Sequence, residues 1–148
     1  FGYNVSRRAS TWPNPAFNGW YGQGSFVLTG EKRGYSPATA AFSSPRPAKP
    51  FAFNGGGLGA WELAARYDVL DLNYNAGVAG IAGPAALGSI RGGRQEAFTA
   101  GLNWYPNAAI RFLFDYQRVD IDRLASAAPF QSIGQTVDIV TARAQLAF

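Results

Sequence analysis

Residues 108–122 read AAIRFLFDYQRVDID, and apolar and polar side chains alternate along this stretch. The apolar positions are Ile110, Phe112, Phe114 and Tyr116. A period of two is that of a β-strand, whose successive side chains point to opposite faces. Average strands have about 5–6 residues, whereas a tilted strand that crosses a bilayer needs about 9–11. The stretch therefore predicts a long strand with one aromatic face and one polar face.

The same alternation recurs along the whole chain and predicts one partial strand and five full strands. Besides 108–122, the expected strands are 1–8, 17–29, 60–69, 94–105 and 136–148. The chain has 148 residues, enough for one domain, and its 18 glycines and 9 prolines require frequent turns. We therefore expect an all-β protein with antiparallel strands.

The composition favours a membrane barrel over a soluble sandwich. Charged residues make up only 15% of the chain, against about 25% in typical soluble domains. A membrane barrel turns apolar side chains toward lipid and polar ones toward a wet lumen. Aromatic residues, which favour the membrane interface, stand at the strand ends: Trp20, Trp61, Trp104 and Tyr105. We expect an antiparallel transmembrane β-barrel, and the alternative is a soluble β-barrel binding module for an apolar ligand.

The residue types that are missing limit the chemistry. The chain has no Cys and no His, which removes thiol catalysis, the Ser-His-Asp triad and the commonest metal ligand. No nucleophile and base are clustered in the sequence, so we expect no enzyme, no cofactor and no metal. The net charge is +4, but the basic residues are scattered singly, which argues against nucleic acid as a partner.

The expected strands are joined by short and long connections. The turn at 105–109 is tight, with Pro106 and Asn107 where a turn favours them. The connections 73–93 and 123–135 are longer and are expected to be loops. The segment 30–59 is long as well, and it carries four basic residues against one acidic residue. Such a charge balance favours anions nearby.

Three groups of residues resemble the phosphate-selective porin O and P family. The first is Gly59–Tyr67, followed by Leu70–Leu72. The second is Thr99–Asn107, followed by Arg111-Phe112 and Asp115-Tyr116. The third is Trp20-Tyr21 together with Leu28–Glu31. Together these motifs extend the resemblance over essentially the whole chain.

The resemblance implies a fold, a location and partners. Members are sixteen-stranded barrels of the bacterial outer membrane, commonly homotrimers, which suggests that this chain is the C-terminal part of such a barrel. It implies passive diffusion of small solutes, with small anions preferred, and the lipid of the outer membrane as surroundings. It places segment 30–59 on the periplasmic side as a long basic turn. It also makes Phe148 similar to the terminal signal that the barrel-assembly machinery reads.

Two sets of basic residues are candidates for contact with anions. The polar face of the expected strands carries Arg8, Arg66, Arg111 and Arg143, together with the acidic Glu62, Asp68 and Asp115. The segment 30–59 carries Lys32, Arg33, Arg46 and Lys49. We expect this segment to fold partly into or across the periplasmic mouth of the lumen. The alternatives are wall charges that pair across neighbouring strands and a periplasmic loop whose charges are solvated.

Overall fold

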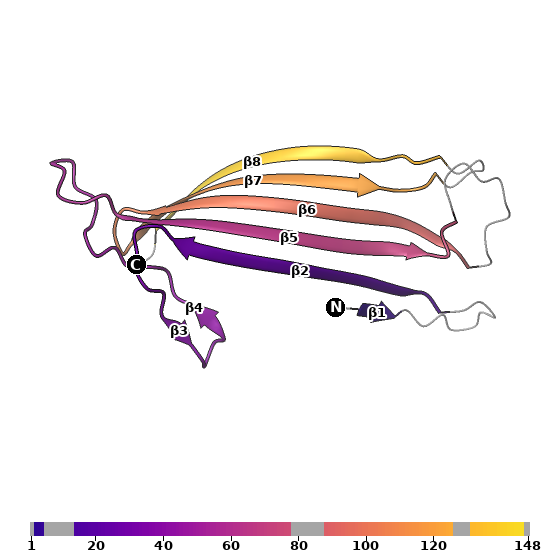
Figure 1. Ribbon diagram of the computed structural model, residues 1–148, viewed down its shortest axis with the longest axis horizontal. Coiled ribbons are helices and arrows are strands. Elements are labelled where there is room, and N and C mark those ends of the chain that lie inside the picture. Colours follow the sequence, from indigo (N-terminus) through magenta and orange to yellow (C-terminus); the bar gives the residue numbers. More distant parts are fainter. Residues whose placement is uncertain (1, 5–13, 78–87, 126–130, 147–148) are drawn as a thin grey trace. The chain divides into compact units, whose positions relative to one another are not determined.

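The computed structural model describes residues 2–4, 14–77, 88–125 and 131–146, and every regular element within them is a strand (Figure 1). The strands are β1 (Gly2–Asn4), β2 (Ala16–Val27), β3 (Tyr35–Ser36), β4 (Ala41–Phe42), β5 (Ala60–Tyr74), β6 (Ile90–Tyr105), β7 (Ile110–Asp122) and β8 (Gln135–Leu146). The all-β expectation is thus confirmed for the described residues. Arg8 and Phe148 lie outside them.

The long strands form one sheet in the order in which they occur in the chain. The order is β1-β2-β5-β6-β7-β8, and the short strands β3 and β4 form a separate two-stranded sheet. β1 is antiparallel to β2, with Gly2 opposite Asn18. The connection from Tyr105 to Ile110 is too short for a crossover, so β6 and β7 are antiparallel as well. Neighbours in sequence are therefore neighbours in space, which is the order of an up-and-down sheet.

The described chain divides into two compact units. The first contains residues 1–22, 67–98 and 118–138, and the second contains 23–66, 99–117 and 139–148. The second unit holds the β3–β4 hairpin and the tight turn between β6 and β7. In that turn, the Asn107 side-chain oxygen accepts hydrogen bonds from the amides of Ala109 and Ile110, each at 2.9 Å. The asparagine thus satisfies two backbone donors where the chain reverses.

Strands β5 and β6 are longer than their sequence pattern predicts. The connection expected at 73–93 is wrong at both ends, because β5 continues to Tyr74 and β6 begins at Ile90. Gly92 explains the second difference. A Cβ at this position would lie 2.6 Å from both the Cβ and the carbonyl oxygen of Leu72. The glycine therefore permits a close approach of two strands, although glycine in a sequence more often indicates a turn.

Large apolar side chains remain exposed on one face of the strands. Phe26, Phe114 and Leu146 expose 70%, 48% and 68% of their surface, and all three lie on the expected aromatic face. Among the described residues, the buried hydrophobic ones are Ala60, Val69, Ala97 and Tyr105. No described helix is long and apolar enough to span a membrane. These three side chains therefore stay largely uncovered by the described part of the chain.

Candidate functional site

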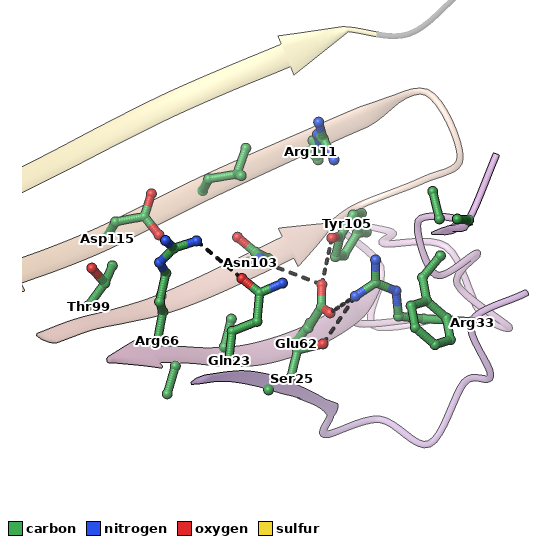
Figure 2. A pocket seen from close by; sticks show the side chains of 18 residues that line it. Gln23, Ser25, Arg33, Glu62, Arg66, Thr99, Asn103, Tyr105, Arg111 and Asp115 are labelled. Carbon is green, nitrogen blue, oxygen red and sulfur yellow. Dashed lines mark hydrogen bonds and ion pairs between the residues drawn. The ribbon is translucent and has the colours of Figure 1, made fainter. Parts of the chain in front are cut away.

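The polar side chains predicted to share one face line a cavity in the second unit. This cavity has a volume of about 550 Å³, and Figure 2 shows its lining. Alternate residues of β2, β5, β6 and β7 contribute Gln23, Ser25, Glu62, Arg66, Thr99, Asn103, Arg111 and Asp115. We call these residues the polar face. The period-two pattern thus correctly identified the members of one surface that comes from four strands.

The β3–β4 hairpin lines the same cavity. Ala40, Ala41 and Phe42 from the hairpin contribute to its lining together with the polar face. The hairpin is closed by the pairing of Tyr35 with Phe42, whose rings lie 5.0 Å apart. Part of segment 30–59 therefore lies against the polar side of the sheet in this unit.

Glu62 is the most deeply buried charged residue in the described part of the chain, with 2% of its side chain exposed. The Tyr105 hydroxyl donates a hydrogen bond to Glu62 Oε2 at 2.7 Å, and Asn103 Nδ2 donates to the same oxygen at 3.3 Å. Arg33 Nη1 lies 2.6 Å from Glu62 Oε1. A buried carboxylate is costly without such partners, and here both of its oxygens have them.

Arg33 connects segment 30–59 to two strands of the sheet. Its Nη1 contacts Glu62 on β5 and also donates to Ser25 Oγ on β2 at 3.0 Å. Its Nε donates to the carbonyl oxygen of Ser43, just after β4, at 2.9 Å. The guanidinium also lies 5.6 Å from the centre of the Phe42 ring. The forked shape of the arginine head is what allows contacts in several directions.

Two further arginines of the polar face contact amide oxygens of glutamine side chains. Arg66 Nη1 lies 3.4 Å from Gln23 Oε1. Arg111 donates to Gln145 Oε1 from Nε at 2.9 Å and from Nη2 at 2.6 Å. A hydrogen bond to an amide oxygen orients a guanidinium without neutralising its charge. Both guanidinium groups line the cavity.

An acidic side chain also faces the cavity. Asp115 lines it, and a Cβ at position 101 would lie 2.5 Å from Asp115 Oδ1. Gly101 thus provides the space that this carboxylate occupies. The polar face therefore carries both signs of charge, as the sequence pattern predicted.

The start of segment 30–59 is fixed by a second carboxylate. Glu31 accepts a hydrogen bond from the Thr29 hydroxyl and another from the amide of Ala48 at 3.2 Å. Thr29 Oγ1 in turn accepts a hydrogen bond from the amide of Trp61 at 3.1 Å. Partial desolvation raises the pKa of Glu31, but these hydrogen bonds outweigh it and leave the pKa below its usual value.

The remaining predicted basic residues of the described part do not line this cavity. Arg46 lines a smaller hollow with Ser44 and Arg111, and Lys32 lines another with Phe26 and Phe42. Lys49 is exposed, and its backbone carbonyl accepts a hydrogen bond from Gly59. Arg143 is exposed on β8. Of the predicted set in the described part, only Arg33, Arg66 and Arg111 therefore line the cavity of the polar face.

The structure corrects the expected position of Tyr105. We predicted it as an interfacial aromatic residue at a strand end, but it is 5% exposed and its hydroxyl binds Glu62 on the polar face. The alternation along β6 already indicates the polar face for Tyr105, because this residue is two positions from Asn103 and four from Gly101. Aromatic composition was a weaker guide here than the alternation of side chains along the strand.

The opposite face of the same strands carries a cluster of stacked rings. Trp104 stacks on Trp61 and on Phe112, with ring centres 5.5 Å apart in both pairs. Phe51 from segment 30–59 meets Trp104 edge-on at 5.2 Å. Trp104 Nε1 also donates to the carbonyl oxygen of Leu58 at 2.9 Å. The segment therefore has anchors on both faces of the strands in this unit.

Comparison with known proteins agrees with strands that have one aromatic face and one polar face. Residues 2–148 match the family described as phosphate-selective porin O and P. The chain belongs to this porin family. The resemblance that the motifs around Trp61 and Trp104 indicated is thereby confirmed.

Two relatives have comparable similarity. An uncharacterized protein of Caulobacter vibrioides is 36% identical over 148 residues, which are 99% of this chain and 26% of that protein. Porin O of Pseudomonas aeruginosa is 30% identical over 108 residues, which are 73% of this chain and 22% of that protein. The chain thus spans about a quarter of the length of the curated relatives that it matches.

Proposed function

We propose that this porin-family chain is part of an outer-membrane porin through which small solutes diffuse passively, with a mild preference for anions. One observation carries the proposal: the strands have an exposed aromatic face and, opposite it, a polar face that lines a cavity. This is the arrangement of a barrel with lipid outside and water inside. No covalent chemistry is required, so we propose a channel rather than an enzyme.

The strands of this chain supply only a portion of the wall. We propose the C-terminal part of a sixteen-stranded barrel, assembled as a homotrimer with the help of the barrel-assembly machinery. The family membership supports the barrel, and the sequential strand order is that of an up-and-down sheet. An open sheet edge in lipid would leave backbone donors and acceptors unpaired. The remaining strands of the full-length protein are therefore needed to complete the pore.

Segment 30–59 is proposed to narrow the lumen at its periplasmic mouth. Its hairpin lines the cavity of the polar face, and Arg33 reaches Ser25 and Glu62 on the wall. Lys32, Arg46 and Lys49 are exposed and none of them is ion-paired with an acidic residue of the described chain. Their charge would favour anions entering or leaving the pore.

Ion selectivity of the full-length protein in a planar bilayer tests this function. A variant with K32Q, R46Q and K49Q together should form channels of normal size, and its reversal potential in a salt gradient should shift toward cation selectivity. The matched control is K32R, R46K and K49R together, which changes the same three side chains and keeps their positive charge. An unchanged reversal potential in the triple variant would exclude a role of these residues in selectivity.

Membrane residence is tested separately. A porin requires detergent for extraction and migrates differently on a gel before and after heating, whereas a soluble binding module would be extracted by salt alone. Extraction without detergent would favour the alternative, a soluble β-barrel for an apolar ligand.

A further inference from the structure

We infer that Arg33 and Glu62 form a neutral latch that positions the β3–β4 hairpin over the polar face, so that Arg33 serves as a positioning residue and not as an anion contact. The inference rests on the proposed function, because it concerns how the constriction of that pore is held. Glu62 is a buried carboxylate that passive diffusion by itself does not use, and its pairing with Arg33 gives it a role.

The geometry of the pair is the first argument. Arg33 Nη1 and Glu62 Oε1 are 2.6 Å apart, and their side chains are 29% and 2% exposed. Charges this close and this shielded attract strongly, and removing one partner would leave the other charge uncompensated. An anion passing through the lumen would compete for Arg33 with a carboxylate already in contact with it. The pair therefore offers little net charge to a solute.

The origin of the contacts is the second argument. Glu62 is on β5, its donors Asn103 and Tyr105 are on β6, and Arg33 is on the segment between β2 and β5. Arg33 also binds the Ser43 carbonyl, so the two ends of the hairpin are held by one side chain. Figure 2 shows Arg33, Tyr105 and Asn103 directed at the Glu62 carboxylate. A single buried acceptor thus joins the wall to the hairpin.

A neighbouring residue provides a comparison on the same segment. Lys32 carries the same charge as Arg33 and precedes it directly, but it is exposed and does not line the cavity of the polar face. Loss of charge at position 32 should alter the local electric field without releasing the hairpin. Loss of charge at position 33 should release the hairpin.

Hydrogen exchange of the full-length porin in detergent tests the latch without depending on conduction. Amides of the hairpin peptide 34–43 should exchange about tenfold faster, or more, in R33Q and in E62Q. K32Q should leave these rates within about twofold of the original. Unchanged exchange in R33Q and E62Q would overturn the latch, even if the protein conducts as proposed. Because exchange is measured on the folded protein, failure of the channel assay would leave this result interpretable.

Reversal potentials distinguish positioning from direct anion contact. E62Q leaves Arg33 unpaired and should increase anion selectivity, whereas R33Q leaves Glu62 unpaired and should decrease it. The double variant R33Q/E62Q removes a neutral pair, so its selectivity should return close to the original value while its hairpin still exchanges rapidly. If the double variant loses anion selectivity as fully as R33Q does, Arg33 acts on the solute itself and the inference is wrong.

Discussion

Phe114 and Leu113 are adjacent on β7 and point to opposite faces, so they test the proposed lipid side of the strands directly. Phe114 is 48% exposed on the aromatic face, whereas Leu113 lines the cavity of the polar face. Phe114→Arg would place a cation against lipid, and Leu113→Arg would place the same cation in a wet lumen. The two variants have the same new side chain and nearly the same position along the strand, which makes one the control of the other.

The magnitude follows from the depth of Phe114. Strand β7 runs from Ile110 to Asp122, so Phe114 is two residues from its centre. At about 3.4 Å per residue and a tilt of about 40°, this is roughly 5 Å from the membrane midplane. The apolar band is about 25 Å tall, and arginine near its centre costs about 2–4 kcal/mol. This cost would change the unfolding equilibrium constant by about 30- to 700-fold.

The assay is unfolding of the full-length protein in phospholipid vesicles by denaturant, followed by tryptophan fluorescence. We expect Phe114→Arg to lower the free energy of unfolding by about 2–4 kcal/mol and Leu113→Arg to lower it by less than about 1 kcal/mol. Equal losses in the two variants would indicate that both faces are enclosed in a protein core. A larger loss for Leu113→Arg would reverse the proposed sides of the sheet.

Two further predictions concern the ends of segment 30–59. Gly59 has φ +73°, and a Cβ there would lie 2.5 Å from the Tyr105 carbonyl oxygen. Gly59→Ala should therefore lower the free energy of unfolding by about 1–3 kcal/mol, measured by thermal unfolding. Gly22→Ala is the control and should lower it far less, because a Cβ at position 22 meets nothing within 4 Å. Equal losses in the two variants would contradict the reasoning. The lowered pKa of Glu31 stabilises the fold above the carboxyl's unfolded pKa, and this contribution is lost as the pH falls through the folded value. Thr29→Val should weaken this acid dependence in pH-dependent unfolding, and an unchanged pH profile would refute the role of that hydrogen bond.

The membership of the polar face could be predicted because it depends only on alternation. Gln23, Glu62, Asn103 and Arg111 lie on four different strands, and the parity of each strand placed all of them on one side. A shift of one residue would have reversed every side chain, so a long alternating stretch leaves little ambiguity. The same reasoning applied to Tyr105 would have placed it correctly.

The contacts of segment 30–59 could not be predicted in the same way. The segment has no sustained period, and Arg33 lies 29 residues from Glu62 in the sequence. Its pairing depends on the path of the chain through the β3–β4 hairpin, which local propensity does not determine. The sequence indicated a basic segment and a set of basic candidates, but it did not indicate that one of these charges is neutralised.

The position of Arg33 in the chain also has a consequence for the order of events during assembly. Arg33 precedes β5 and β6, but its anchor is complete only when Glu62 and Tyr105 are next to each other on those strands. Closing a loop of this length costs chain entropy of about 3 kcal/mol, and pairing of β2 with β5 through the Leu28 amide and the Trp61 carbonyl already supplies that closure. The strands of the sheet would therefore pair first, and the hairpin would dock afterwards in a late, separate kinetic phase. If the hairpin narrows the lumen as proposed, a newly inserted barrel would conduct more current for a short time than the mature one.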